Sequence, residues 1–586
     1  MDFSYFHRFA INLLARRLLV GIALACGWGG LSVRAETAAL PHEDATPSMH
    51  IFGMPPIRTY SYEEIGNVSA GVQLGSDPLG RLTVVHKGSY IVFDDKNWND
   101  NLDRSNDTTM ISRVTRGPDG RMYCAGPATW GYLEYQANGM VRVHSLRPAT
   151  YPSWVANDVF DRIIFANNVV AFAGDAGVVF YDLKSQKTRY EKFETVCAFA
   201  LHDDIFLSSY SRGLCRYDTK TEEFEQLETN PTKDNTIESA TAWDEDHVLV
   251  FTYARYTAIF DGKTKKRWVT DVDDLLVDGV APMLRLDGGL VAIGIKEHGL
   301  RILDQNGHSV MALDESNYAG IHELCATEPG VLWFSSEQGI SKLLYSSPIS
   351  IFDHRLGLTL SWPALVKKDD KTLVVSGGKL YEPIAGREGE PTQFRPISVK
   401  LMSEVWAAAA APGGLLLANS QGLYFRSDNG EVEKIFGDVN VNRIICTNTE
   451  THTYFVMGAG ISCVVRYDNG SWIEVGHRLK DTDYPSQMIC VAPDSVWVEL
   501  GVNRVGHFVL DHDQLKQDVL TRFPQKQSVW INIGAIGHTV ILTQTKTDRL
   551  YFDEDKKAFV NDSPYKNLLE NTPYNVIRPA QDAFGS

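Results

Sequence analysis

The sequence predicts an all-β protein of tandem β-propellers, with about 12–14 four-stranded blades divided between two rings. One observation is a unit of about 42 residues that recurs along the chain, which is the period of a four-stranded blade. A second is that turn signals follow one another at the short spacing typical of strands, and no segment has a long helical period. The chain of 586 residues also exceeds what one hydrophobic core usually serves.

Two segments show the repeat most clearly. Gly330–Ile340 reads as a turn, an apolar strand, a short polar loop, a glycine and a second strand, and Gly414–Tyr424 reads in the same way. The same pattern is anchored at twelve positions, with steps of 36 to 46 residues: 88, 131, 177, 213, 256, 299, 339, 378, 422, 460, 504 and 548. Each copy predicts one blade, because a lone four-stranded sheet cannot bury both of its faces.

A polar turn follows the third strand of many repeats. Tyr181–Lys184, Tyr217–Lys220, Phe260–Lys263 and Phe552–Asp555 each place an aspartate directly after an aromatic strand residue. Aspartate, asparagine and glycine supply the backbone angles and local hydrogen bonds that a hairpin turn requires. These turns predict the link between the third and fourth strands of each blade.

Twelve blades exceed the four to eight of a typical ring, so the sequence predicts two rings. We expect a signal peptide at residues 1–35, a first propeller at 36–345 and a second at 346–586, with the seam between residues 340 and 365. The printed sequence ends inside an apparent blade, at Val576–Gly585, and a further strand is expected near Met49–Phe52. A blade can also be shared between the two chain ends of one ring.

The first 35 residues have the pattern of an export signal. Arg8, Arg16 and Arg17 precede the apolar run Leu18–Ala25, and Val33–Ala35 supplies a cleavage site. We expect cleavage after Ala35, with an uncleaved anchor or a lipid on Cys26 as the alternatives. The predicted location is therefore periplasmic or otherwise extracytoplasmic.

The charge of the chain argues against nucleic acid as a partner. The formal net charge is −17, and removing the basic residues 1–35 leaves about −20. Such a surface repels polyanions and accommodates a neutral or cationic ligand more easily. Seven cysteines would remain, none in a CxxC pair, and we expect buried free thiols, because Cys197 and Cys215 fall on non-adjacent strands of one blade.

On these motifs the sequence resembles the two-component regulator propeller family, the periplasmic sensor region of bacterial two-component and hybrid sensors. Gly330–Ile340 carries the family's glycine, apolar pair ending in tryptophan, polar loop, glycine and apolar residue, and Gly414–Tyr424 and Gly289–Leu303 are similar. Ile65–Ser69 through Asp77–Arg81 adds to the likeness. The resemblance covers most of residues 50–586.

The resemblance implies a periplasmic propeller pair that binds a small molecule or oligosaccharide, often a glycan fragment. In the family a triple-tyrosine domain, a membrane helix and a kinase or DNA-binding output usually follow. Residues 1–586 contain no such module. The expected output kinase or regulator is therefore either in cis, beyond this sequence, or in trans, and a homodimer is left open.

Binding residues are expected in the loops between second and third strands, which share one propeller face with the inter-blade loops. Aromatic rings there can stack on sugar C–H groups, and charged side chains can orient hydroxyls. We predict ligand binding by eight residues: Trp130, Tyr210, Arg212, Tyr253, Arg255, Lys296, Glu297 and His298. Ring geometry should bring Arg255, Glu297 and His298 together beside Tyr210 and Arg212, although any one of these side chains could instead serve blade packing.

No catalytic residue, metal site or cofactor is predicted, and we expect the protein not to be an enzyme. The sequence has no GxSxG, HExxH or phosphate-binding loop. The acidic segment Asp271–Asp278 lacks the glycine and terminal glutamate of a calcium loop, so a solvated loop is favoured. Two alternatives stay open: a carbohydrate-active lyase or hydrolase with carboxylates from different blades, and an extracytoplasmic scaffold that binds another protein.

Overall fold

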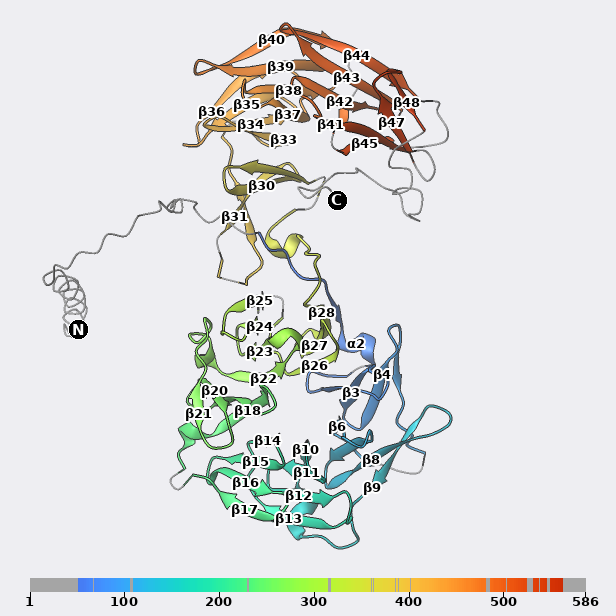
Figure 1. The fold of residues 1–586 in the computed structure, drawn as a ribbon, viewed down its shortest axis with the longest axis vertical. Coiled ribbons are helices and arrows are strands. Elements are labelled where there is room, and N and C mark those ends of the chain that lie inside the picture. The colour runs from blue at the N-terminus through green and yellow to red at the C-terminus, as the bar shows by residue number, and fades with distance from the viewer. Residues whose placement is uncertain are drawn as a thin grey trace, which may run out of the picture. The chain divides into compact units, whose positions relative to one another are not determined.

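The described residues form twelve four-stranded antiparallel sheets (Figure 1). The structure is a computed structural model that describes residues 51–561, except 67, 106–108, 229–230, 315–317, 360, 362, 385, 388, 401, 481–484, 502, 524–530, 537 and 545–548. These residues belong to one compact unit, Met49–Ser586. The predicted signal peptide and the apparent blade at Val576–Gly585 lie outside the described residues.

The first seven sheets take residues 57–344. Six of them are built from consecutive strands: β2 (Gln73–Ser76), β3 (Leu82–His86), β4 (Ser89–Phe93), β5 (Trp98–Asp100); β6 (Arg113–Arg116), β7 (Met122–Gly126), β8 (Thr129–Tyr135), β9 (Val141–Ser145); β10 (Phe160–Ala166), β11 (Val169–Gly174), β12 (Gly177–Asp182), β13 (Thr188–Lys192); β14 (Cys197–Leu201), β15 (Asp204–Ser209), β16 (Gly213–Asp218), β17 (Glu223–Gln226); β18 (Ile237–Ala242), β19 (Val248–Thr252), β20 (Thr257–Phe260), β21 (Lys265–Arg267); β22 (Val280–Arg285), β23 (Val291–Ile295), β24 (Gly299–Leu303), β25 (Ser309–Leu313). The seventh sheet joins β26 (Glu323–Glu328), β27 (Val331–Ser336) and β28 (Gly339–Leu344) to β1 (Ile57–Tyr60).

Five further sheets take residues 364–560. Their strands are β29 (Ala364–Lys368), β30 (Lys371–Ser376), β31 (Lys379–Ile384), β32 (Gln393–Ile397); β33 (Ala407–Ala411), β34 (Gly414–Asn419), β35 (Gly422–Ser427), β36 (Val432–Gly437); β37 (Arg443–Asn448), β38 (Thr453–Gly458), β39 (Ile461–Asp468), β40 (Ser471–Lys480); β41 (Pro485–Ile489), β42 (Ser495–Leu500), β43 (Arg504–Asp511), β44 (Gln514–Arg522); β45 (Ile531–Ile536), β46 (Thr539–Gln544), β47 (Arg549–Asp553), β48 (Ala558–Val560). The first strands of these sheets contact one another in chain order.

Helical structure in the described part of the chain is limited to single turns. They are α2 (Tyr62–Ile65) and the 3₁₀ turns η1 (Ser153–Asn157), η2 (Lys233–Asn235), η3 (Leu276–Asp278), η4 (Asp287–Gly289) and η5 (His354–Leu356). No helix among these residues is long and apolar enough to cross a membrane. The all-β, blade-repeat prediction is confirmed. Eleven of the twelve sequence anchors lie within two residues of the start of a third strand, and the twelfth, position 548, lies outside the described residues.

The first seven sheets close into a ring. Their innermost strands contact one another in chain order from β2 to β26, and β26 lies against β2. Strand β1 completes the last sheet by pairing antiparallel with β28, with Ile57 opposite Leu343 and Tyr60 opposite Ile340. Gly339 allows this approach, because any side chain there would collide with the carbonyl oxygen of Tyr60. Closure of this kind leaves few exposed strand edges.

The strand predicted near Met49–Phe52 begins further along the chain. Ile51 and Phe52 are not in a strand, and the strand that the chain supplies at this end is β1, five residues further on. Its sequence, Ile-Arg-Thr-Tyr, has no clear alternation of apolar and polar residues. Its place is decided by the free edge of β28. The division of the chain at residue 345 stays a prediction.

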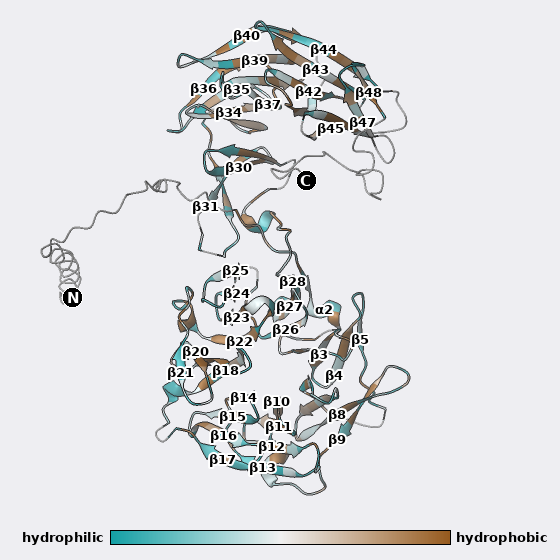
Figure 2. Cartoon of the chain, viewed as in Figure 1, coloured by the Kyte–Doolittle hydropathy of each residue, from teal (hydrophilic) through white to brown (hydrophobic). Residues whose placement is uncertain are grey.

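Hydrophobic side chains lie between neighbouring sheets. Every residue of β11 and β23 is buried, because both faces of an inner strand pack on an adjacent blade. Outer strands such as β17 are mostly exposed and charged, and Figure 2 shows hydrophilic colour on β17 and β21. Burial thus decreases from the inner strands to the outer strands of each sheet. This explains why the second strand gives the clearest apolar run in each repeat.

The predicted aspartate turns and free thiols are present. Asp261 Oδ1 accepts hydrogen bonds from the backbone amides of Lys263 at 2.8 Å and Thr264 at 2.6 Å. These bonds hold the pKa of Asp261 at about 2. All seven described cysteines are free; five are buried, as predicted, whereas Cys446 and Cys490 are only partly buried. Cys197 and Cys215 lie on the first and third strands of one sheet.

Candidate functional site

Seven of the eight predicted binding residues lie in loops between second and third strands. Tyr210 and Arg212 join β15 to β16, Tyr253 and Arg255 join β19 to β20, and Lys296–His298 join β23 to β24. These loops are tied to the inter-sheet loops by a recurring backbone hydrogen bond, from Tyr253 to Thr236 at 2.8 Å and from Lys296 to Gly279 at 3.0 Å. The two kinds of loop therefore share one face of the ring.

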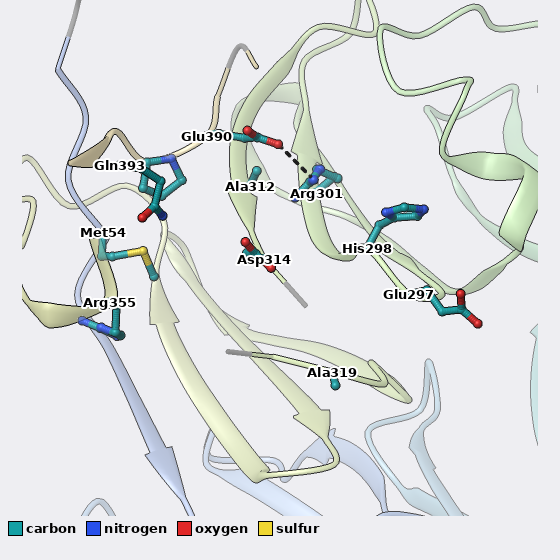
Figure 3. Close-up of a pocket in the computed structure, with 11 residues that line it drawn as sticks. Met54, Glu297, His298, Arg301, Ala312, Asp314, Ala319, Arg355, Glu390 and Gln393 are labelled. Carbon is teal, nitrogen blue, oxygen red and sulfur yellow. Dashed lines mark hydrogen bonds and ion pairs between the residues drawn. The ribbon is translucent and has the colours of Figure 1, made fainter. Parts of the chain in front are cut away.

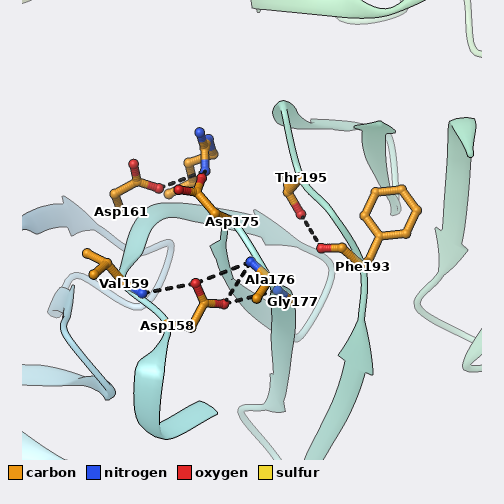
Figure 4. Close-up of polar contacts among 9 residues, drawn as sticks. Asp158, Val159, Asp161, Asp175, Ala176, Gly177, Phe193 and Thr195 are labelled. Carbon is orange, nitrogen blue, oxygen red and sulfur yellow. Dashed lines mark hydrogen bonds and ion pairs between the residues drawn. The ribbon is translucent and has the colours of Figure 1, made fainter. Parts of the chain in front are cut away.

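Asp158 shows how such loops are held in place. Its carboxylate accepts hydrogen bonds from the backbone amides of Val159 at 3.0 Å, Ala176 at 3.1 Å and Gly177 at 3.0 Å (Figure 4). A side chain at position 174 would collide with that carboxylate, so the glycine there is required. A buried carboxylate on this face thus serves the fold, by satisfying amides that a turn leaves unpaired.

Trp130 is not a binding platform. It lies within β8, is fully buried, and packs edge to face on Phe160 with ring centroids 5.6 Å apart. The prediction that it presents a ring to a ligand is wrong. The reason is that the strand begins one residue before Trp130, which turns the ring into the core between two sheets.

Arg212 also takes part in packing. Its guanidinium lies over the rings of Phe193 and Phe224, at 5.0 and 5.2 Å from their centroids, and 3.7 Å from a carboxylate oxygen of Glu191. These partners belong to β13, to the loop that follows it and to β17. The described contacts do not bring Arg212 together with Arg255.

Tyr210 and Tyr253 come together with three charged groups. Their rings lie edge to face with centroids 5.9 Å apart. The Lys233 ammonium lies 5.2 Å from the Tyr210 centroid and 4.3 Å from the Tyr253 centroid. Glu238 Oε1 accepts a hydrogen bond from the Tyr210 hydroxyl at 3.4 Å, and Oε2 accepts one from Arg255 Nη1 at 3.2 Å. We call these five residues the tyrosine cluster.

Glu297 and His298 line a cavity of about 570 Å³ to which no residue of that cluster contributes. His298 Nε2 lies 2.9 Å from Asp278 Oδ2, whereas Lys296 does not line the cavity. We call the cavity the Arg301 pocket, and Figure 3 shows its lining residues: Met54, Glu297, His298, Arg301, Ala312, Asp314, Ala319, Arg355, Glu390, Pro391 and Gln393.

Arg301 is a buried cation in the wall of this pocket. Its side chain is 9% exposed, and Nη2 lies 3.4 Å from Glu390 Oε1. Nη1 is buried and has no hydrogen-bond partner among the described residues. Burial lowers the pKa of Arg301, against the opposing effect of Glu390. A guanidinium without a full set of acceptors is costly in a folded protein, so this wall is a place where a ligand oxygen would be stabilising.

Arg355 supplies a second guanidinium with fixed geometry. Its Nη2 lies 2.7 Å from Asp353 Oδ2, and Nη1 donates to the Tyr318 hydroxyl at 3.2 Å. The hydrogen bonds to Asp353 raise the pKa of Arg355. This arginine is therefore oriented by its own partners, whereas Arg301 retains an unused donor.

The loop that carries Glu390 is anchored to the first ring. The backbone amide of Ala312 donates to the Gly389 carbonyl at 2.9 Å, and Arg387 Nη2 lies 2.9 Å from Asp274 Oδ2. The amide of Thr392 donates to the Phe52 carbonyl at 2.8 Å. These contacts hold Glu390 over Arg301, 89 positions away in the sequence.

Arg301, Arg355 and Glu390 are absent from the predicted site. One sequence signal could have indicated Arg301: it is the charged residue in the otherwise apolar strand Gly299–Leu303, all of whose residues are buried. A charge in such a strand needs a partner, and often marks a site. No comparable signal exists for Glu390, which lies in a polar loop.

The four aspartates of the acidic segment Asp271–Asp278 each pair with another group of the protein. They are the Ser309 amide for Asp271 at 2.7 Å, Thr270 Oγ1 for Asp273 at 2.7 Å, Arg387 Nη2 for Asp274 at 2.9 Å, and His298 Nε2 for Asp278 at 2.9 Å. Across the described ranges, no group of three or more His, Cys, Asp or Glu residues could hold a metal ion. These hydrogen bonds and ion pairs hold the segment against neighbouring loops and strands.

A further ion pair lies on the inner strands of the ring. Arg113 Nη1, on β6, is 2.7 Å from Glu323 Oε1, on β26, and both strands flank β2. Burial raises the pKa of Glu323, although Arg113 opposes the effect. Burial also raises the pKa of Asp161, where Arg162 is the larger opposing charge and Arg113 a smaller one.

No family model and no curated protein matches the chain. Among solved structures, the chain is similar to the extracellular domain of the hybrid two-component system BT3049 from B. thetaiotaomicron, with 12% identity, a TM-score of 0.56, and coverage of 91% of this chain and 81% of the other. The extracellular domain of the system BT4673 from the same organism has 12% identity and a TM-score of 0.40, over 87% and 78% of the two chains, which is too low to support an inference. At these identities the first likeness shows that the two chains share a fold.

Proposed function

We propose that this chain is the extracytoplasmic ligand-sensing part of a bacterial two-component-type signalling system, and that the Arg301 pocket binds a small hydroxyl-rich molecule, such as a glycan fragment. The fold shared with a sensor's extracellular domain supports the first part. The unused donor of the buried Arg301 carries the second part. A kinase or regulator, in the same polypeptide or another, would receive the signal.

The composition of the lining supports this ligand class. Glu297, Asp314 and Glu390 offer carboxylate acceptors, and Arg301 and Arg355 offer donors. A sugar hydroxyl is both a donor and an acceptor, so neighbouring hydroxyls can pair with both kinds of group. A polyanion is disfavoured, because the carboxylates outnumber the guanidinium groups. The cavity volume of about 570 Å³ lies within the range of small-molecule pockets.

Calorimetry with neutral and uronic oligosaccharides tests the proposal. Replacing Arg301 with Gln, which keeps most of the side-chain volume, should weaken binding by about tenfold or more, because a hydrogen bond to a charged group contributes about 1.5–3 kcal/mol. Glu297→Ala should weaken binding less. The control variants Lys296→Ala and Arg255→Ala lie outside the pocket and should bind as the wild type does. Unchanged affinity in both Arg301→Gln and Glu297→Ala would place the ligand elsewhere.

We further propose that the pocket binds its ligand without transforming it. The supporting observation is that both guanidinium groups of the pocket are held in ion pairs, Arg355 with Asp353 and Arg301 with Glu390. Prolonged incubation with each oligosaccharide, followed by chromatography, should return the substrate intact. Cleavage that is lost in Glu323→Gln or Asp161→Asn would instead support the carbohydrate-active alternative, with the two carboxylates of raised pKa as its acid and base.

A further inference from the structure

The ammonium group of Lys233 lies between two tyrosines from different sheets. Lys233 belongs to η2, in the loop between β17 and β18, and its Nζ lies over both Tyr210 and Tyr253, at 5.2 and 4.3 Å from their ring centroids. Tyr210 follows β15 and Tyr253 follows β19, so two neighbouring sheets supply the two rings. A cation within about 6 Å of an aromatic face is attracted by the ring quadrupole.

A fixed carboxylate completes this arrangement. The Glu238 side chain is 19% exposed, and its two oxygens accept hydrogen bonds from Tyr210 and Arg255. It therefore stays beside the rings whether or not Lys233 does. Two aromatic faces and a carboxylate are the groups that recognise an alkylammonium ion. Consistent with this, a hydrogen bond with Tyr253 raises the pKa of Lys233.

The lysine can leave without disturbing the other groups. Its side chain is exposed and has four rotatable bonds, whereas the loop backbone is held by bonds from the Ala254 amide to the Asp234 carbonyl at 3.2 Å and from the Tyr253 amide to the Thr236 carbonyl at 2.8 Å. Rotation of the side chain alone would take its ammonium group off both rings, while the Arg255 guanidinium stays 5.6 Å from the Tyr253 centroid. The position is built for a cation and is occupied by one from the chain itself.

We propose that Tyr210, Tyr253 and Glu238 form a binding site for a protonated amine or quaternary ammonium group of a ligand, and that Lys233 occupies this site as an internal competitor. The site shares no residue with the Arg301 pocket and does not depend on the function proposed for it. A tethered competitor acts at an effective concentration of the order of millimolar, so a monovalent amine binds weakly until Lys233 is displaced. The acidic surface favours cations on approach.

Titration of the full chain with tetramethylammonium chloride at constant ionic strength tests this competition. Lys233→Ala should bind the ion at least tenfold more tightly than the wild type. Adding Tyr210→Leu or Glu238→Gln to Lys233→Ala should remove the gain. Lys220→Ala is the matched control, since Lys220 is an exposed lysine in the turn between β16 and β17 that pairs with Asp203 at 2.7 Å. It should behave as the wild type.

A spectroscopic measurement provides an independent test. After reductive ¹³C-methylation of the lysines, the Lys233 methyl signal, assigned by its loss in Lys233→Ala, should be shifted upfield by the two rings and should return towards the ordinary value as tetramethylammonium is added. The proposal is overturned if Lys233→Ala binds no better than the wild type, or if the added Tyr210→Leu leaves its affinity unchanged. Arg301→Gln should not alter either result, which separates this site from the pocket.

Discussion

The Arg301 pocket and the tyrosine cluster are built from equivalent loops of consecutive sheets, yet their chemistry differs. The loop after β19 presents Arg255, whose side chain is 39% exposed. The loop after β23 leads into β24, where Arg301 is 9% exposed because the Glu390 loop covers it. Equivalent loops of the repeat can thus border an exposed cation site or a partly enclosed pocket. The difference comes from the segment packed on top of each loop.

The largest expected effect contrasts two aromatic residues that were both predicted to bind ligand. Trp130→Ala should destabilise the fold by about 3–5 kcal/mol, because it removes a fully buried ring. Tyr210→Ala should cost less than about 1 kcal/mol, since that ring is 38% exposed. Urea unfolding followed by tryptophan fluorescence and circular dichroism measures both. Equal losses would contradict the assignment of Trp130 to the core.

The next effect contrasts two carboxylates that pair with arginines. Glu390→Ala should cost about 1–3 kcal/mol, because it leaves the buried Arg301 guanidinium without its partner. Glu238→Ala should cost about 1 kcal/mol or less, because Arg255 remains in contact with solvent. Differential scanning calorimetry of the two variants gives the comparison. A smaller loss for Glu390→Ala would mean that the Glu390 loop does not cover the pocket in solution.

A partly buried and an exposed carboxylate should give opposite pH dependences. Burial raises the pKa of Glu323, so the stability linked to this group is greatest at low pH and falls as pH rises above about 4.3, the unfolded value. The stability of Glu323→Gln relative to the wild type should therefore improve from pH 4 towards neutrality.

The opposite sign is expected at Asp261, whose pKa is about 2 because of backbone amides. Its contribution is present above the unfolded value of about 3.9 and is lost as pH falls towards 2. Asp261→Asn should therefore approach the wild type in stability at low pH. Thermal unfolding of both variants across this range tests the pair of slopes, and parallel slopes would contradict the raised pKa of Glu323.

The smallest expected effect is at the edge of the tyrosine cluster. Tyr210→Phe removes a hydroxyl whose bond to Glu238 is 3.4 Å long. Stability should change by less than about 0.5 kcal/mol, as for most exposed substitutions. A loss of more than about 1 kcal/mol in the free energy of unfolding, measured with urea, would show that the Tyr210–Glu238 hydrogen bond stabilises the fold.

The repeat, the strand order within each blade and the loop positions of most candidate residues could be predicted from the sequence. Each depends on patterns within about 42 residues: an apolar second strand, a glycine before the third, and an aspartate at the turn that follows. The prediction for Trp130 was wrong because the strand begins one residue before it. A shift of one residue in a strand boundary decides whether a ring faces the core or belongs to a loop.

The Arg301 pocket and the closure of the first ring were decided by tertiary structure. The pocket joins Arg301 to Glu390 across 89 positions, and closure joins Ile57 to Leu343. Neither pairing produces a local sequence pattern. Strand β1 takes its place because β28 has a free edge, and Arg301 becomes a candidate binding residue because the Glu390 loop buries it. The sequence pattern within one repeat determines the strands of one blade, whereas burial depends on distant segments that only the assembled fold brings together.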